Sequence, residues 1–340
     1  MRARELGIAI GSLPAGPLDA ITDVEGVRVG HTTLIEGDDV RTGVTVVLPP
    51  DEPVFAAPFR LNGNGEMTGL EWIREIGLLT TPIGLTNTHS LGVVRDALVR
   101  VAVSREPAPP WSLPVVAETW DGFLNDINGF HVREEHVVAA VEAASGGPVA
   151  EGNVGGGTGM ICHGFKGGIG TASRVTDGGH TVGVLVQANH GRRVRFTVAG
   201  VAVGEQLGGD RIPLPGGPEG AGSIIVIVAT DAPLLPHLCE RLATRAALGI
   251  GRTGGLGEDS SGDLLLAFAT GNRGLLFPEP DTVTTLWRMN DLFAAAVEAT
   301  EEAILNALLA AETMTGYEGH LAHALEADAL LEVLRRCGRL

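Results

Sequence analysis

Aromatic residues, charged residues, cysteines and long apolar runs are all scarce in this sequence. Phe, Trp and Tyr together make up 4% of the 340 residues, so stacking on nucleic-acid bases is not expected to be a main activity. The formal net charge of −17 points the same way, because a polyanion would be repelled. We therefore expect no nucleic-acid partner.

Cysteines are few and have no metal-binding spacing. Cys162, Cys239 and Cys337 are odd in number and far apart, with no CxxC pattern, which predicts reduced, buried thiols. The ten histidines include no HExxH motif, and His89, His163 and His190 stand in unlike stretches. A metal site needs three or four converging ligands, so we expect no metal and no other cofactor.

No apolar run approaches the roughly 20 residues that span a bilayer. The first residues, MRARELGIAIGSLPAGPLDAITD, lack the continuous apolar core of a signal peptide. We therefore expect a soluble, cytoplasmic protein with no membrane partner. The composition, 44% hydrophobic and 19% charged, is typical of a folded globule.

Glycine is abundant, with 49 residues spread through short loops, and the apolar pattern between them mixes strands and helices. No internal repeat is visible. Strands are predicted over 27–34, 42–49, 114–120, 180–189, 195–204, 223–230 and 263–270. Helices are predicted over 69–76, 91–104, 132–144, 234–248, 290–311 and 325–336.

One long stretch, 204–222, shows no periodicity. It reads GEQLGGDRIPLPGGPEGAG, with six glycines before Gly222 and three prolines. A loop of this length inside a compact fold is either functional or a linker. It ends at Ser223, which stands directly before the apolar run IIVIVA.

A second glycine-rich stretch, EGNVGGGTGM over 151–160, resembles a dinucleotide-binding fingerprint only superficially. Such a fingerprint follows a strand and opens a helix, whereas this one follows SGGPVA and leads into ICHGFKGGIGTAS. We interpret it as a tight loop that shapes the floor of a pocket.

Ser223 has two interpretations, an ordinary strand start or a nucleophile exposed by cleavage of the chain before it. No GxSxG motif marks another serine. If the Gly222–Ser223 bond is cut, Ser223 carries both a hydroxyl and a free α-amine, whose pKa of about 7.7–8 suits a general base. The nucleophile then brings its own base. Gly222 has no side chain to shield its carbonyl.

A second polar group lies in GEDSSGDLLLAF. Ser261 and Asp263 are two residues apart at the start of a predicted strand, so their side chains lie on one face. A hydroxyl beside a carboxylate can orient a neighbouring amine or nucleophile. The alternative is a polar turn in which Asp263 accepts local backbone hydrogen bonds.

Several blocks of the chain resemble a family of self-processing aminopeptidases, which includes L-aminopeptidase/D-Ala-esterase and the β-peptidyl aminopeptidases. The resemblance covers nearly the whole length. The blocks are GLTNTHSLGVVRDA (84–97), AETWDGFLNDING (117–129), EGNVGGGTGM (151–160), GFKGGIGTAS (164–173), VGVLVQAN (182–189), GSIIVIVATDAPLLPH (222–237), SSGDLLLAFATGN (260–272) and EEAILNALLAAETMTG (301–316).

The resemblance implies an α/β fold, a four-layer αββα sandwich formed by a single catalytic domain over 1–340. It implies one self-cleavage at Gly222–Ser223, giving an α chain (1–222) and a β chain (223–340). It also implies a homo-oligomer of α/β pairs that needs no cofactor or metal.

The same resemblance suggests roles for individual residues. Ser223 is the nucleophile, and Asn189 donates from its side chain to the oxyanion. Ser261 and Asp263 position the nucleophile and its amine, although the family more often has a glutamate at the second position. Glu118 holds the free amine of the substrate, with Trp120 beside it. From the residues alone, Asn189 could instead cap its strand, and Glu118 could belong to a turn at AETWDG.

The sequence thus predicts a hydrolase, a serine N-terminal-nucleophile aminopeptidase acting on small peptides, amides or esters with a free amine. Two alternatives remain. One is a self-cleaving acyltransferase of similar architecture, which passes the acyl group to an amine. The other is an uncleaved, non-catalytic binding protein.

Overall fold

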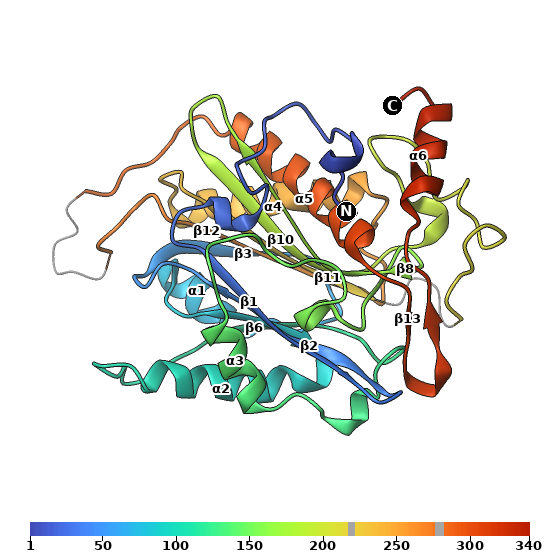
Figure 1. Cartoon of the computed structure of the whole chain (residues 1–340). Helices are drawn as coiled ribbons and strands as arrows, with labels where there is room; N and C mark the ends of the chain where they lie inside the picture. The colour runs from blue at the N-terminus through green and yellow to red at the C-terminus, as the bar shows by residue number, and fades with distance from the viewer. Residues whose placement is uncertain (217–221, 276–281) are drawn as a thin grey trace.

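Two β-sheets stack face to face, and helices cover the outer face of each (Figure 1). The computed structural model describes residues 1–216, 222–275 and 282–340. One sheet has the order β1-β2-β5-β6 and the other β4-β3-β12-β11-β10-β9. The strands of the first are β1 (Arg28–Glu36), β2 (Val40–Leu48), β5 (Ile83–Asn87) and β6 (Val115–Thr119). Those of the second are β4 (Leu78–Leu79), β3 (Val54–Gly63), β12 (Gly262–Ala269), β11 (Ser223–Thr230), β10 (Thr181–Asn189) and β9 (Gly168–Val175).

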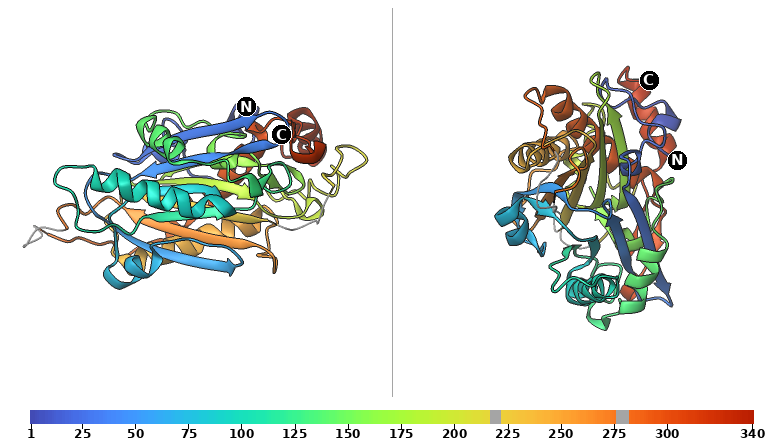
Figure 2. Two further views of the ribbon diagram at one scale, coloured as in Figure 1. Left: turned by 90° about the horizontal axis from the view of Figure 1, so that it is seen from below. Right: turned by 90° about the vertical axis from the view of Figure 1, so that its left-hand side faces the viewer.

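The helices lie on both sides of this pair of sheets, as the end-on views make clear (Figure 2). Helices α2 (Leu91–Val103) and α3 (Glu134–Glu142) pack on the smaller sheet, while α4 (Pro236–Arg252) and α5 (Asn290–Ala310) pack on the larger. Helix α1 (Leu70–Ile76) follows β3, and α6 (Ala327–Arg336) lies near the C-terminus. Two small hairpins complete the strands, β7 (Ile161–Cys162) with β8 (Phe165–Lys166) and β13 (Met314–Thr315) with β14 (Leu321–Ala322). Short 3-10 helices span Arg4–Leu6, Ile21–Asp23, Thr88–Ser90, Ile127–Gly129, Gly155–Gly157, Arg193–Arg195 and Tyr317–Gly319.

Strand β11 shows why the layers form. All eight of its residues are buried, and successive side chains point to opposite faces of the sheet. Ile224, Val226 and Val228 pack in the core beneath α4 and α5, whereas Ile225 and Ile227 pack in the core between the sheets. A third core lies between the smaller sheet and helices α2 and α3. The predicted four-layer αββα sandwich is confirmed.

All six predicted helices are present, with ends within about two residues of the expected positions except for α4, which continues to Arg252. The strand predicted over 195–204 is wrong. Ala199 (φ 50°) and Gly200 (φ 79°) turn the chain back on itself, and Val198 and Val201 pair with each other in a single bridge. The apolar run 195–204 therefore forms a tight turn between two short extended segments.

The loop before Ser223 has no helix or strand between residues 204 and 222 in the part that the structure describes, as predicted; residues 217–221 lie outside that part. The glycine stretch 151–160 forms one 3-10 turn and opens no longer helix. A Cβ on Gly156 would lie 2.2 Å from Gln187 Oε1 and 2.7 Å from Leu85 O, so the stretch is glycine-rich because backbones approach closely there. Among the described helices, none is both long and apolar enough to cross a bilayer.

Candidate active site

The ends of three neighbouring strands bring the predicted polar residues together. Asn189, the last residue of β10, pairs with Ser223, the first residue of β11. On the other side, β11 runs parallel to β12, with Ile224 opposite Asp263. Directly paired residues in a sheet lie about 4.5–5.5 Å apart. Sheet register therefore places Asn189, Ser223 and Asp263 at one edge of the larger sheet.

The Ser223 hydroxyl is buried and has a fixed partner. The side chain lies in a residue that is only 5% exposed, and its Oγ accepts a hydrogen bond of 2.9 Å from the backbone N–H of Gly262. A hydroxyl still has its proton to donate when it accepts such a bond. The oxygen is thus held in place at the strand start with its donor capacity available.

Ser261 and Asp263 lie side by side, as their spacing predicted. Ser261 Oγ donates to Asp263 Oδ1 at 2.5 Å, and both residues are buried. Burial raises the pKa of Asp263 from its ordinary value of 3.8 to about 6, although hydrogen bonds from Ser261 and from the backbone of Ile224 oppose this effect. Gly262, which holds Ser223, stands between these two residues. Ser261 and Asp263 therefore lie on either side of the residue whose backbone N–H donates to Ser223, the candidate nucleophile.

The Asn189 amide is locked in orientation by two hydrogen bonds. Its Oδ1 accepts from the backbone N–H of Ile161 at 2.7 Å, and its Nδ2 donates to the carbonyl of Trp120 at 2.8 Å. An amide nitrogen carries two hydrogens, and this contact uses one of them. The second hydrogen remains available to another acceptor, as the predicted role of an oxyanion donor requires.

Gly222 lies in contact with the backbone of Asn189. A Cβ on Gly222 would stand 1.8 Å from Asn189 O and 3.4 Å from Asn189 Nδ2. No larger residue fits there without displacing the strand end. The requirement for glycine at this position is therefore steric, and it brings the candidate scissile bond next to the Asn189 amide.

Glu118 is the second-last residue of β6, and Trp120 is the first residue after this strand. The buried Glu118 carboxylate accepts hydrogen bonds from the Thr88 hydroxyl and, at 2.9 Å, from the backbone N–H of Glu66. Burial raises the pKa of Glu118, and these two donors partly offset the effect. A Cβ on Gly65 would lie 3.0 Å from Glu118 Oε1 and 3.2 Å from Gly262 Cα. Gly65 thus lies between Glu118 and Gly262, whose backbone N–H donates to Ser223. Trp120 is 40% exposed.

Sequence reasoning missed the residues that support this arrangement. Gly262 and Thr88 bond Ser223 and Glu118. The buried carboxylate of Asp121 accepts from Asn87 and Asn125 at 3.0 and 3.2 Å, and burial raises its pKa to about 6. The sequence signal that could have found these residues is a run of polar residues at each strand end, TNTHS at the end of β5 and WDGFLND after β6.

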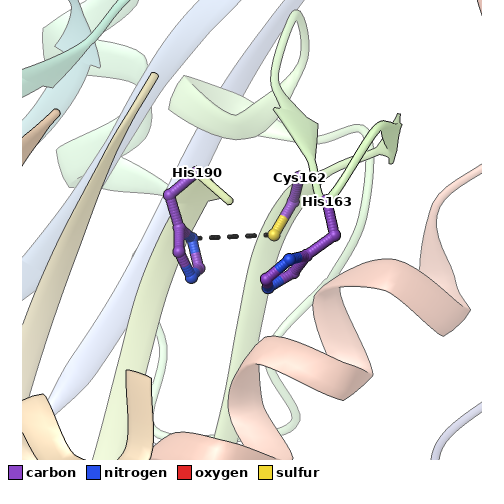
Figure 3. A group of neighbouring side chains, drawn as sticks. All are labelled: Cys162, His163 and His190. Carbon is purple, nitrogen blue, oxygen red and sulfur yellow. Dashed lines mark hydrogen bonds between the residues drawn. The ribbon is translucent and has the colours of Figure 1, made fainter. Parts of the chain in front are cut away.

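The histidines and cysteines are arranged differently from expectation. His89 stays apart and stacks on Phe130. Cys162, His163 and His190, by contrast, form a buried group of three that could hold a metal ion (Figure 3). The expectation that no such ligands converge was wrong, because a hairpin turn and a strand end meet only in the folded chain.

Comparison with known proteins agrees with this geometry. A sequence model of peptidase family S58 matches residues 19–322. The chain belongs to peptidase family S58. The S58 chain is 48% identical to beta-peptidyl aminopeptidase BapA of Sphingosinicella microcystinivorans, over all of this chain and 93% of the relative. It is 44% identical to BapA of Sphingosinicella xenopeptidilytica, over 98% and 91%.

Solved S58-like structures show the same architecture. A β-aminopeptidase from Burkholderia sp. superposes with a TM-score of 0.93 at 55% identity, over 99% of each chain. The L-aminopeptidase D-Ala-esterase/amidase of Ochrobactrum anthropi, a serine aminopeptidase with a variant of the Ntn hydrolase fold, superposes with a TM-score of 0.91 at 45% identity, over 100% of this chain and 99% of the other. The S58 chain is accordingly a hydrolase of the aminopeptidase type with an Ntn hydrolase fold.

Proposed function

We propose that this S58 aminopeptidase activates itself by cutting its own Gly222–Ser223 bond. The Ser223 hydroxyl oxygen attacks the Gly222 carbonyl carbon and the C–N bond breaks, so the acyl group moves from nitrogen to oxygen. Water then cleaves this ester. The single catalytic domain becomes two chains, 1–222 with a new carboxylate and 223–340 with Ser223 as its free N-terminus.

The observation that carries this proposal is that Asn189, Ser223 and Asp263 lie together where β10 ends and β11 and β12 begin. The Asn189 amide is fixed by Ile161 and Trp120, so its remaining hydrogen is preorganised for negative charge on the attacked oxygen. Such a donor stabilises the transition state without reorganising when charge develops.

In turnover, the new α-amine of Ser223 takes the hydroxyl proton while Oγ attacks the substrate carbonyl. The same amine then gives a proton to the departing amine, and water releases the acyl group from Ser223. The Asp263 carboxylate, which accepts a hydrogen bond from Ser261, holds the amine and the nucleophile in place. No metal or organic cofactor takes part in this scheme.

The substrates that we propose are small peptides, amides and esters with a free N-terminal amine. Glu118 supports this choice, since its carboxylate is buried and only Gly65 lies between it and Gly262, the residue that bonds Ser223. The relatives named for β-peptidyl and L-amino acid substrates fit the same class. We further propose a cytoplasmic homo-oligomer of α/β pairs, as the family resemblance implies.

The experiment is to compare short peptide amides with a free or an acetylated N-terminus, in wild type and in Glu118→Gln. We expect the wild type to release the first residue only from the free amine and Glu118→Gln to lose most of this preference through a higher KM. Equal turnover of both substrates by the wild type would contradict the proposed substrate class.

The same assay separates hydrolysis from acyl transfer, the second candidate activity. With an added amine acceptor, a hydrolase gives mainly the free acid, whereas an acyltransferase gives mainly the new amide. The other alternative, a non-catalytic binding protein, has lost its basis because the chain belongs to a peptidase family.

A further inference from the structure

A second buried polar group lies directly beyond the active-site candidate. Cys162 is the last residue of β7, His163 follows it in the turn to β8, and His190 follows Asn189 at the end of β10 (Figure 3). Cys162 and His163 are fully buried and His190 is 3% exposed. None of these side chains has a part in the proposed cleavage.

The turn that carries His163 adopts an unusual conformation. His163 (φ 50°) and Gly164 (φ 68°) are both left-handed, as in a two-residue type I′ hairpin turn. Residues other than glycine are uncommon in this region, and histidine is among the few that are enriched there. The backbone N–H of His163 donates to His190 O at 2.7 Å. That bond ties the turn to the end of β10 and keeps both imidazoles in the interior.

Two imidazole nitrogens in this group have no hydrogen-bond partner, although they are buried. They are Nε2 of His163 and Nε2 of His190; the other nitrogen of His190, Nδ1, is the one that faces Cys162 Sγ. His163 Nδ1 lies 3.4 Å from the carbonyl of Arg192, which favours a proton on Nδ1 and a free lone pair on Nε2. A backbone carbonyl behind a histidine is the usual partner of a metal-ligating imidazole.

The spacing of the ligand atoms fits a small metal ion. Cys162 Sγ and His190 Nδ1 are 3.6 Å apart, and one ligand atom from each of the three residues lies within 4.8 Å of the others. With a metal–sulfur bond of about 2.3 Å and a metal–nitrogen bond of about 2.0–2.1 Å, two tetrahedral ligands stand about 3.6 Å apart. The Cys162–His190 pair therefore already has the separation that a bridging ion requires.

We propose that Cys162, His163 and His190 bind one thiophilic metal ion, Cu⁺ or Zn²⁺. Thiolate and imidazole ligands select these ions over magnesium or calcium. Binding displaces the Cys162 thiol proton to solvent and forms one metal–sulfur and two metal–nitrogen bonds, with no change of oxidation state.

The charges around the group favour Cu⁺ over Zn²⁺. The charged side chains that act on it are Lys166, beside Cys162, and Arg193, beside His163. The Lys166 ammonium donates to the carbonyls of Gly157, Met160 and Gly167. A thiolate neutralises Cu⁺ but leaves Zn²⁺ with a net positive charge, which the Arg193 guanidinium disfavours.

The test measures bound metal in full-length protein from cells grown with added copper or zinc, and again after Cu⁺ or Zn²⁺ titration of purified protein. We expect one equivalent per chain in the wild type and at least about a 100-fold weaker affinity in Cys162→Ser. Co²⁺ should give a thiolate charge-transfer band in the wild type that Cys162→Ser lacks.

Two matched variants serve as controls. Cys239, on α4, is also a buried thiol, and its Sγ donates to the carbonyl of Phe55. His31 is also a histidine whose Nε2 is buried and unpartnered. Cys239→Ser and His31→Gln should keep full metal binding. His163→Asn, whose side chain tolerates a left-handed backbone, should lose it even if Cys162→Ser does not fold. Failure of the wild type to take up either ion in cells or in titration, or equal uptake by His163→Asn, would overturn the proposal in favour of a plain S–H···N hydrogen bond.

Discussion

The two ends of the sandwich differ, because one has a large cavity and the other has the buried polar residues of the candidate active site. At the end where β2 stops and β5 begins lies a cavity of about 640 Å³, lined by Trp72, Trp111 and several prolines. Its carboxylates form exposed ion pairs, Arg28 with Asp51 and Arg273 with Glu52, and backbone contact lowers the pKa of Glu52. At the opposite end, where β5 and β6 stop, the carboxylates are buried and burial raises the pKa of Asp263 to about 6.

The cavity near Trp72 and Trp111 therefore does not coincide with the candidate active site at Ser223. Buried carboxylates with raised pKa values are common at catalytic sites, and burial raises the pKa of Asp263, Glu118 and Asp121 at this end. Burial also raises the pKa of Asp19 and Glu151 to about 7, but these two pair with Arg2 beside β9. The wide cavity offers apolar surface but charged groups that water already solvates. The predictions that follow therefore place functional effects at the Ser223 end and only small effects at the tryptophan end.

The largest effect is expected at Asn189. Asn189→Ala should slow both self-cleavage and turnover by about 10²–10³-fold, because the oxyanion loses its side-chain donor. Asn189→Asp keeps an oxygen for the Ile161 N–H and removes only the donor, so it should be equally slow. Rates of fragment formation and of peptide hydrolysis measure the two steps. An active Asn189→Asp would show that Asn189 only supports the strand end.

Gly222→Ala should slow self-cleavage by about 10²-fold. The new methyl group would stand 1.8 Å from Asn189 O, and a displacement of the scissile bond by about 1 Å costs this much in rate. The control is Gly216→Ala in the same loop, where a Cβ meets nothing within 4 Å. Densitometry of the fragments over time gives both rates. Equal rates in the two variants would remove the steric argument for Gly222.

The pH dependence should show an acidic limb near pH 6. The Ser223 amine loses its neutral form below its pKa of about 7.7–8, so kcat/KM should already fall about tenfold per pH unit there. Asp263 is protonated below its pKa of about 6 and then no longer holds the Ser223 amine by charge, so the fall should become steeper below that value. Because the folded state binds this proton more tightly than the unfolded state, the carboxyl makes folding less favourable as pH rises from about 4 to 6. The acidic limb is thus not unfolding through Asp263. An unchanged limb in Asp263→Asn would assign it to another group.

The smallest effect distinguishes two exposed tryptophans. Trp120→Ala, at the Ser223 end, should raise KM for peptides severalfold, since an exposed aromatic side chain there adds contact area for a substrate. Trp111→Ala, at the wide cavity, should leave KM and kcat unchanged. Michaelis–Menten measurements on the same peptide compare the two. A larger effect at Trp111 would reverse the contrast between the two ends.

Much of the fold could be predicted because local pattern and tertiary role agree. Six helices and most predicted strands followed from periodicity and their glycine and proline boundaries. Strands β3, β5 and β9 were missed, since VFAAPFRLNG, IGLTN and GIGTASRV contain proline, glycine and polar residues that the sheet tolerates through pairing. Propensity is local, whereas strand pairing depends on distant residues.

In the candidate site, too, local contacts could be predicted from the sequence and contacts between distant segments could not. The spacing of Ser261 and Asp263 predicted their contact, because two residues in one strand share a face. The contact of Gly262 with Ser223 and the meeting of Cys162 with His190 join segments 39 and 28 residues apart. No local spacing carries that information, so only the folded sheet edge shows it.

The most direct test of self-activation is the intact mass of the purified protein. The account predicts two fragments, 1–222 and 223–340, from the wild type and one whole chain from Ser223→Ala under the same conditions. A wild-type chain that stays whole while it hydrolyses peptides, or a Ser223→Ala chain that is still cut between residues 222 and 223, would contradict it.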